Sequence, residues 1–502
     1  MLSQPRIAAA FRWQYLPMVA LVALKLALHL YANRDYGFLR DELAYIDDGK
    51  HLALGYVDHP PLVPFFAAAA RLVWGDSSLL GLRLWPALCS SALLAVTMQM
   101  AREFGGRRLA ALLAGLAFIA APIFLASGVL FQTVTFDLLW WGLASLSFVR
   151  LVRTHDERWW LAIGVFAGLG LLTKYTVVFY AAGFTLALLV SGDRRSFLRP
   201  WPWIAVAIAT CIAVPNIAWQ VSHSFIGLDY TDAINQRDQS IGRTDSFLPE
   251  QLLLLGPPAV FVWGAGLAWL LRARAAAPYR VLGWTFLFTV ALFALSQGRG
   301  YYTAAVYPPL MAAGGVGFEG LRPGRLRTAA VAMVTVLLVA GGVFAASVSL
   351  PVAPAGSGYF EFASGLNEDL PEMIGWPEMV ETIALVRDEL ADDERDYAAV
   401  LAGNFGLAGA VNLYGPRYEL PGAISPVNTY YYWSEGRLDA PVYLVVGFSE
   451  QHVRDLCRSV EVGAVLRNSE GVDNDESGGR VYICRDLHRP LADVWPALRR
   501  FG

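Results

Sequence analysis

The segment from Arg40 to Leu62, RDELAYIDDGKHLALGYVDHPPL, concentrates ionisable side chains: five carboxylates, two histidines and a lysine. Asp41, Tyr45 and Asp48 are spaced i, i+4 and i+7, so a helix through this stretch places all three on one face. Glu42 points elsewhere. A carboxylate held in this way can act as a general base toward a hydroxyl group.

Asp58 and His59 form a second group, just before a double proline. The prolines stop a helix and favour an extended backbone, so they predict a rigid corner. We interpret Asp35, Asp47 and Lys50 as solvated loop residues. Asp58, like the carboxylates above, is flanked by aromatic and apolar residues, and a carboxylate held against apolar surface is costly unless it serves a site.

The rest of the chain must position these groups, and it is mostly apolar: of 502 residues, 56% are hydrophobic and 16% are charged. Runs of about 17–25 apolar residues can cross a bilayer as helices. About eleven such runs predict a mainly α polytopic membrane protein, with a helix count of up to about 13. The runs are 14–32, 79–101, 109–127, 134–151, 159–173, 175–191, 201–220, 250–272, 280–297, 303–319 and 328–350.

Charge is distributed unevenly along this pattern. With a cytoplasmic N-terminus, the inner loops carry most of the arginines and the outer loops most of the aspartates, which is a strong positive-inside signal. The division predicts a transmembrane body, 1–350, with long outer loops at 33–78 and 221–251, and an extracytoplasmic domain, 351–502. A short third loop, 296–302, falls on the same side, so groups from three loops can line one cavity.

The C-terminal part is punctuated by proline and glycine and reads as a small α/β domain. YAAVLAG and PVYLVVGF predict buried strands, and PEMVETIALVRDEL predicts a helix with Met379, Ile383, Val386 and Leu390 on one face. No Walker loop or G-x-G-x-x-G fingerprint is present, so we expect no nucleotide cofactor. Cys457 and Cys484 lie in this domain, where an oxidising compartment allows pairing, but the sequence leaves their pairing open.

Several ordered motifs resemble the family 39-like GT-C glycosyltransferases, the superfamily of protein O-mannosyltransferases and lipid A aminoarabinose transferases. The acidic pair in RDELAY and the corner GYVDHPPL are similar to that family's first outer loop. GLGLLTKYTVV, GRGYYTAAVYPPLMAAGG and GNFGLAGAVNLYGP are similar to its later segments, and the likeness covers nearly the whole chain. Ala44 departs from the arginine of the aminoarabinose transferases, which weakens any inference of the same donor sugar.

The resemblance implies an inverting glycosyltransferase in a bacterial inner (plasma) membrane. It would move a sugar from a polyprenyl-phosphate donor to a hydroxyl on a protein, lipid or cell-envelope glycan at the outer face. Partners are then the donor, the acceptor and the bilayer, with no nucleic acid. The donor sugar stays open among mannose, galactose, arabinose and galacturonate. A divalent metal (Mg, Mn, Ca or Zn) can assist the departing phosphate.

The resemblance also assigns roles to residues. Asp41 matches the family's base, Glu42 its support or substitute, Asp58 a metal ligand, and His59 stands where relatives often carry lysine. His223 is a weak metal candidate. Substrate contacts are predicted at Tyr45, Tyr56, His59, Lys174, Arg237, Arg299, Tyr301 and Tyr302. Lys174 and Arg299 have a simpler interpretation as snorkelling residues at helix ends.

Three other functions remain open. A transporter also needs many helices and buried charges, but transporters place their charges near the bilayer midplane. A non-catalytic sensor or assembly protein would make the first-loop carboxylates dispensable. A lipid-linked glycan polymerase or ligase is the nearest enzyme alternative.

Overall fold

The computed structural model describes residues 4–34, 36–191 and 193–502. The chain divides into two compact units. Unit 1 comprises residues 1–32, 83–222 and 235–350. Unit 2 comprises residues 33–82, 223–234 and 351–502, so the first outer loop belongs to the same unit as the C-terminal part of the chain.

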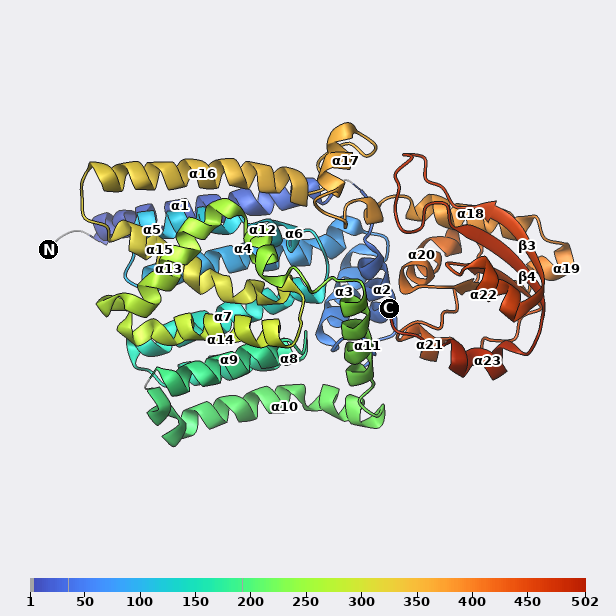
Figure 1. Cartoon of the computed structure of the whole chain (residues 1–502), viewed down its shortest axis with the longest axis horizontal. Helices are drawn as coiled ribbons and strands as arrows, with labels where there is room; N and C mark the ends of the chain where they lie inside the picture. The colour runs from blue at the N-terminus through green and yellow to red at the C-terminus, as the bar shows by residue number, and fades with distance from the viewer. Residues whose placement is uncertain (1–3, 35, 192) are drawn as a thin grey trace. The chain divides into compact units, whose positions relative to one another are not determined.

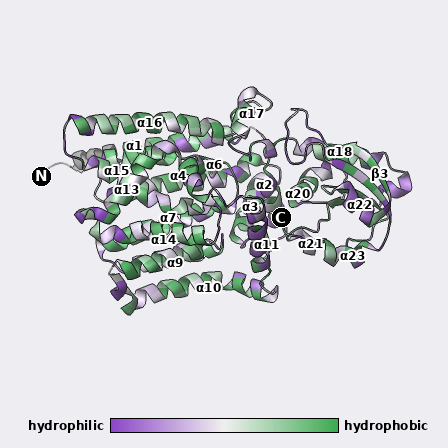
Figure 2. Cartoon of the chain, in the orientation of Figure 1, coloured by the Kyte–Doolittle hydropathy of each residue, from purple (hydrophilic) through white to green (hydrophobic). Residues whose placement is uncertain are grey.

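Unit 1 is a bundle of apolar helices (Figures 1 and 2). Within the described residues, six helices are long and apolar enough to cross a membrane: α1 (Gln4–Ala32, from Tyr15), α4 (Leu79–Glu103), α7 (Thr133–Thr154), α10 (Pro200–Ser222), α14 (Arg280–Leu295, with the 3-10 turn η3, Arg274–Tyr279) and α16 (Arg325–Ser349). Helices α12 (Phe247–Leu255) and α13 (Val260–Arg272) meet at an angle of 90°, which is the geometry of a broken span or of a re-entrant loop.

Shorter helices complete the bundle: α5 (Arg108–Ile119), α6 (Pro122–Ala126), α8 (Trp159–Leu171), α9 (Val177–Val190) and α15 (Tyr307–Glu319). All eleven predicted runs are helical, but some are broken; Pro122, for example, opens α6 after α5 has ended. The chain is therefore a multi-pass membrane protein, whereas the count of eleven spans stays a prediction.

Close helix packing in unit 1 uses small residues. Gly266 on α13 and Gly314 on α15 each face the backbone of the other helix, and neither leaves room for a Cβ. This is how apolar helices approach closely when lipid supplies no hydrophobic drive between them.

Two polar residues of α1 have partners inside the bundle. Lys25 and His29 are buried. Lys25 Nζ donates to Phe124 O at 2.9 Å, and the His29 ring lies 3.0 Å from Leu125 O. These are backbone carbonyls of α6, and Ser90 Oγ also donates to Phe124 O at 2.8 Å, so polar groups of the bundle are paired inside the protein.

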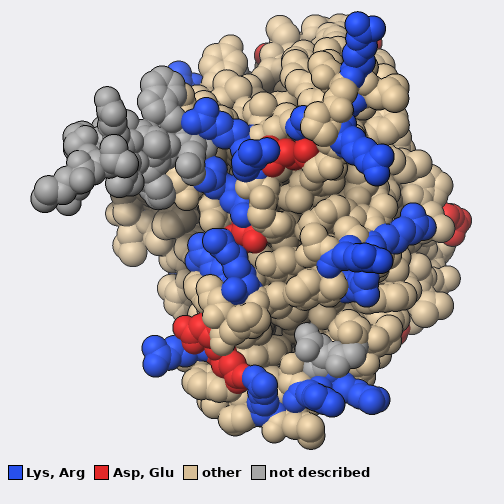
Figure 3. Space-filling model, turned by 90° about the vertical axis from the view of Figure 1, so that its left-hand side faces the viewer, with Lys and Arg blue, Asp and Glu red and all other residues tan. Residues whose placement is uncertain are grey.

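Basic side chains gather on one end of the bundle, where Figure 3 shows far more Lys and Arg than Asp and Glu. Part of this charge is internally compensated, because Glu103 pairs with Arg150 and Arg153. The predicted charge asymmetry is thus a property of the folded surface as well as of the sequence.

The C-terminal part of unit 2 is built on a four-stranded sheet of order β1-β2-β4-β3. The strands are β1 (Ala399–Ala402), β2 (Val442–Val446), β3 (Cys457–Val465) and β4 (Arg480–Leu487); β1 and β2 are parallel and the other pairs antiparallel. The helices are α17 (Gly358–Ser364), α18 (Trp376–Asp388), α19 (Asp392–Arg395), α20 (Phe405–Tyr414), α21 (Tyr430–Trp433), α22 (Glu450–Leu456) and α23 (Leu491–Leu498). Both predicted strands and the predicted helix α18 are confirmed; Met379, Ile383 and Val386 are buried on it, and Leu390 is buried two residues after its end.

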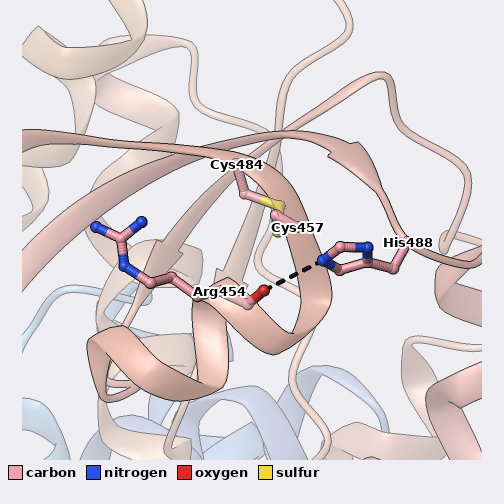
Figure 4. Close-up of a disulfide and its surroundings, with 4 residues drawn as sticks. All are labelled: Arg454, Cys457, Cys484 and His488. Atoms are coloured by element: carbon pink, nitrogen blue, oxygen red, sulfur yellow. Dashed lines mark hydrogen bonds between the residues drawn. A yellow bond between two sulfur atoms is a disulfide. The ribbon is translucent and has the colours of Figure 1, made fainter.

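A disulfide joins Cys457 at the start of β3 to Cys484 on β4, which answers the question that the sequence left open (Figure 4). Beside it, the ring of His488 lies 3.3 Å from Arg454 O. The bond ties α22 and the edge strand to the centre of the sheet.

Candidate active site

Helix α2 (Arg40–Lys50) carries the first-loop carboxylates, as the i, i+4, i+7 spacing predicts. Its start is fixed by Glu42, whose carboxylate accepts a hydrogen bond from Leu39 N at 2.9 Å. Glu42 is fully buried. A glutamate in the first turn that bonds back to the backbone stabilises a helix N-terminus. Glu42 thus has a structural task, and its predicted catalytic role stays a prediction.

Asp41 is half-buried, and further charged groups lie near it. The neighbouring Arg40 pairs with Asp475 at 2.8 Å. Asp369 lies close enough that burial, followed by the charge of Asp41, raises the pKa of Asp369 to about 6. Asp369 could not be predicted as part of this group, since nothing in its local sequence marks it and only the fold brings it near Asp41.

His59 is held at both ring nitrogens. Nε2 lies 3.0 Å from Asp48 Oδ2, and Nδ1 lies 3.0 Å from Pro60 O. A carbonyl oxygen and an ionised carboxylate only accept, so both nitrogens donate and the ring is an imidazolium. Burial lowers the pKa of His59, but Asp58 and Asp48 outweigh it and raise that pKa to about 9.

Aromatic rings enclose this cation. The rings of Tyr45 and Tyr56 lie 4.8 and 4.9 Å from the His59 ring. The hydroxyl of Tyr56 donates within the loop, 3.1 Å from Asp48 O and 3.2 Å from His51 O. Tyr45 is buried, and burial together with the nearby carboxylates raises its pKa. Both tyrosines therefore support the His59 corner from inside unit 2.

Asp58 is the open member of this group: its side chain is 26% exposed and 3.9 Å from His59 Nε2. As a metal site the group is incomplete, because His59 has no nitrogen lone pair left to coordinate. Among the described residues, no three His, Cys, Asp or Glu side chains are grouped so that they could hold a metal ion. The described residues at this corner therefore do not form a complete metal site.

His223 lies elsewhere in unit 2, with its ring 6.2 Å from that of Tyr432. The loop that contains it is largely helical: α11 spans Ile226–Ser240. Tyr230 on this helix is among the groups that raise the pKa of Tyr45, so α11 lies near the first-loop group. The sequence predicted only a loop here.

Asp47 is not solvated, contrary to the sequence interpretation. It is 1% exposed, and its carboxylate accepts hydrogen bonds from Asn412 Nδ2 at 2.6 Å, Tyr430 Oη at 2.8 Å and Lys50 Nζ at 3.0 Å. The donors Asn412 and Tyr430 come from α20 and α21. Asp47 thus fixes α2 to the C-terminal part of unit 2, a contact that local sequence cannot reveal.

A second group of predicted residues lies in unit 1. The ammonium of Lys174, in the break between α8 and α9, sits 4.9 Å from the ring centre of Tyr301 and 4.4 Å from that of Tyr302. Both tyrosines belong to the 3-10 turn η4 (Gly300–Val306). Burial raises the pKa of Tyr302 to about 12. The structure thus brings Lys174 to two adjacent tyrosines that lie more than 120 positions later in the sequence.

Asp137 on α7 joins this group and was missed from the sequence. It is 6% exposed, and it accepts hydrogen bonds from Trp141 Nε1 at 2.8 Å and Thr176 Oγ1 at 3.0 Å. Lys174 acts on it electrostatically. An aspartate inside a predicted span could have indicated a functional site, because an ionisable side chain in an apolar helix is costly.

Arg299 and Arg237 share one carboxylate. Arg299 makes a bidentate pair with Asp238, with Nε 2.5 Å from Oδ2 and Nη2 3.1 Å from Oδ1. Arg237 Nη2 lies 3.3 Å from Asp238 Oδ1. The hydrogen bonds to Arg299 hold the pKa of Asp238 below its usual range despite burial. The sequence indicated Asp238 only as one of the outer-loop aspartates and not as a site residue.

Helix α12 fixes the turn that carries Arg299 and the two tyrosines. Gln251 donates to Gly300 O at 3.0 Å and accepts from Thr303 and Tyr307. Glu250 accepts from Gly300 N at 3.2 Å. The predicted residues therefore form two groups, one in each unit, and the single cavity proposed for the three loops stays a prediction.

Comparison with known proteins supports this assignment of the fold. The family model for dolichyl-phosphate-mannose-protein mannosyltransferase matches residues 58–219. The lipid A galacturonosyltransferase RgtD of Rhizobium johnstonii is 28% identical over 261 residues, 51% of this chain and 55% of the relative. The chain thus matches about half the length of this curated relative.

Solved structures agree over a longer stretch. ArnT from Cupriavidus metallidurans bound to undecaprenyl phosphate matches 93% of this chain and 97% of its own, with 16% identity and a TM-score of 0.61. The apo form of ArnT matches 95% and 98%, with 17% identity and a TM-score of 0.62. The chain has the GT-C glycosyltransferase fold, and the resemblance read from its motifs is confirmed.

Proposed function

We propose that this chain is an inverting glycosyltransferase that takes a sugar from a polyprenyl-phosphate donor. The observation that carries the proposal is the fold: it is shared over nearly the whole chain with a protein whose structure holds undecaprenyl phosphate. The family model and the galacturonosyltransferase relative point to the same chemistry.

In the proposed reaction, Asp41 accepts the proton of the acceptor hydroxyl as its oxygen attacks the anomeric carbon. The bond from that carbon to the donor's phosphate oxygen breaks, and its electron pair leaves with the polyprenyl phosphate. One displacement inverts the anomeric configuration. The half-buried position of Asp41 on a capped helix supports this role, because a base must be held in place and yet be reachable.

The departing phosphate needs positive charge, and unit 1 offers candidates for it. Lys174 has its ammonium held over two tyrosine rings, while Arg237 and Arg299 share Asp238. Arginine meets phosphate through paired donors, and lysine as a point charge. We assign the donor phosphate to this group. His59 serves as a fixed charge beside Asp58, since its nitrogens are already bonded.

Two observations support an extracytoplasmic reaction in a bacterial inner membrane. The disulfide lies in the C-terminal part of unit 2, and disulfides persist in oxidising compartments. The basic end of unit 1 fits the cytoplasmic side. The relative named for lipid A favours a lipid acceptor over a protein.

The test is transfer by purified wild type and Asp41→Asn in lipid, with polyprenyl-phosphate sugars including galacturonate, and detection of released polyprenyl phosphate. We expect one donor to be consumed and the variant to lose about 10²–10⁴-fold in rate. Asp396→Asn, an exposed carboxylate, is the matched control. Full activity of Asp41→Asn would remove Asp41 as the base. A solute crossing vesicles, with no donor consumed, would favour a transporter.

A further inference from the structure

Helix α17 (Gly358–Ser364) has apolar side chains on two sides. Phe360 and Ala363 are buried in unit 2, at 3% and 0% exposure. Tyr359 and Phe362 are 45% and 51% exposed, as is Leu366 just after the helix, at 58%. At about 100° per residue these three lie within about 60° of one another, with Glu361 on the other side of the helix.

The place of α17 in the chain limits what can cover this exposed stripe. The long apolar span α16 ends at Ser349, and only eight residues separate it from Gly358. Val352, in this short connection, is also 38% exposed. A stripe of aromatic and aliphatic side chains directly after a span is typical of the membrane–water interface, where tyrosine and phenylalanine settle.

Exposed apolar side chains also occur where the first segment of unit 2, residues 33–82, meets a span. Helix α3 (Leu62–Trp74) ends in Leu72, Val73 and Trp74, which are 89%, 68% and 44% exposed. Span α4 begins five residues later, at Leu79. Exposed apolar side chains thus mark a second junction between unit 2 and a span.

We propose that α17 lies in the interfacial layer of the bilayer. Tyr359, Phe362 and Leu366 insert among the lipids and form a membrane anchor for unit 2. Inserting these side chains among the lipids removes apolar surface from water, which is favourable. Ser357, which accepts from Phe360 N at 3.2 Å, caps the helix start.

Contacts within unit 2 link this membrane anchor, α17, to the helix that carries the proposed base. The Phe360 ring lies 5.7 Å from that of Tyr36, whose hydroxyl donates to Ala353 O. The next residue, Gly37, donates to Met373 O at 2.9 Å, and α2 with Asp41 begins three residues later. The depth of α17 therefore sets the depth of Asp41. The importance of the depth of Asp41 rests on the proposed function, whereas the membrane anchor formed by α17 does not.

The test measures depth with spin labels. In a background with Cys89 and Cys211 replaced and the disulfide intact, single cysteines are placed by Phe362→Cys and, as control, Leu385→Cys on α18, a residue that is 59% exposed. After reconstitution in vesicles, we expect the Phe362 label to be several-fold more accessible to oxygen, relative to a water-soluble nickel chelate, than the control.

Equal accessibility of the two labels would overturn the proposal. A Phe362 label shielded from both reagents, with spin–spin coupling between copies, would assign the stripe to a second copy of the chain and would also overturn it. The depth measurement needs no substrate, so a failure of the glycosyltransferase proposal leaves it intact. Once transfer activity can be measured, Phe362→Glu should lower it, whereas Phe362→Trp should retain it.

Discussion

His59 and Asp48 form a buried ion pair, with Nε2 3.0 Å from Oδ2 and both side chains 6% exposed. Burial raises the pKa of Asp48 to about 6, with partial compensation by His59, while the pKa of His59 rises to about 9. Between these limits both members carry charge. The corner that bears Asp58 is therefore held by a pair that functions across neutral pH.

The pair predicts a pH-dependent stability. Because the folded pKa of His59 lies above its unfolded value of about 6.5, its contribution is complete below that value and is lost as pH rises through about 9. Asp48, whose folded pKa is also raised, favours the folded state most at low pH and loses that contribution between about 4 and 6. We expect apparent Tm to fall between about pH 6.5 and 9 in wild type and to be flatter there in His59→Gln. Parallel curves would contradict the pairing.

Asp47 should be a stability residue. Asp47→Ala leaves Asn412, Tyr430 and Lys50 without their shared acceptor, so we expect a loss of about 3–5 kcal/mol. Thermal unfolding of the purified protein should show an apparent Tm several degrees lower. Asp396→Ala, at an exposed position, should change little, and equal stability of both variants would remove this role.

Lys174 should act on the donor. Losing one charged hydrogen bond costs about 1.5–3 kcal/mol, so Lys174→Gln should lower kcat/KM by about 10–100-fold. Lys174→Arg should retain more activity. Arg322→Gln, which removes an exposed cation from another loop of unit 1, is the control. If Lys174→Gln matched wild type, the snorkelling interpretation would stand.

The Arg299–Asp238 pair predicts non-additive effects. Arg299→Ala leaves Asp238, which is 2% exposed, with only the longer contact to Arg237, and should cost about 3–5 kcal/mol. Removing both partners should cost less than the Arg299→Ala change alone. A double-mutant cycle of apparent stability measures this coupling, and additive losses would show that the pair does not act as a unit.

Metal removal should have little effect. Both nitrogens of His59 are occupied by hydrogen bonds, and no three His, Cys, Asp or Glu side chains in the described part of the chain are grouped to hold a metal ion. We expect transfer after treatment with a chelator to stay within about twofold, a change of under 0.5 kcal/mol in the barrier. A loss restored by added Mg²⁺, Mn²⁺, Ca²⁺ or Zn²⁺ would show that the substrate itself completes a metal site.

Local patterns were enough to predict several elements. Apolar runs located the helices, the i, i+4, i+7 spacing placed Asp41, Tyr45 and Asp48 on α2, and alternating strand and helix patterns located the C-terminal sheet. Motif order across the chain then indicated the GT-C fold. These signals are short-range, because backbone periodicity and burial leave their mark directly on neighbouring residues.

Other features depended on tertiary structure. Asp47 reads as a loop acid, yet Asn412 and Tyr430, more than 360 positions away, enclose it. Asp369 comes to Asp41 only because the C-terminal segment packs on α2, and His59 becomes an imidazolium only where Asp48 turns toward it. The sequence by itself determined which segments are apolar and which carry charge. The tertiary structure decided which charges meet, since burial and pairing depend on groups that are distant along the chain.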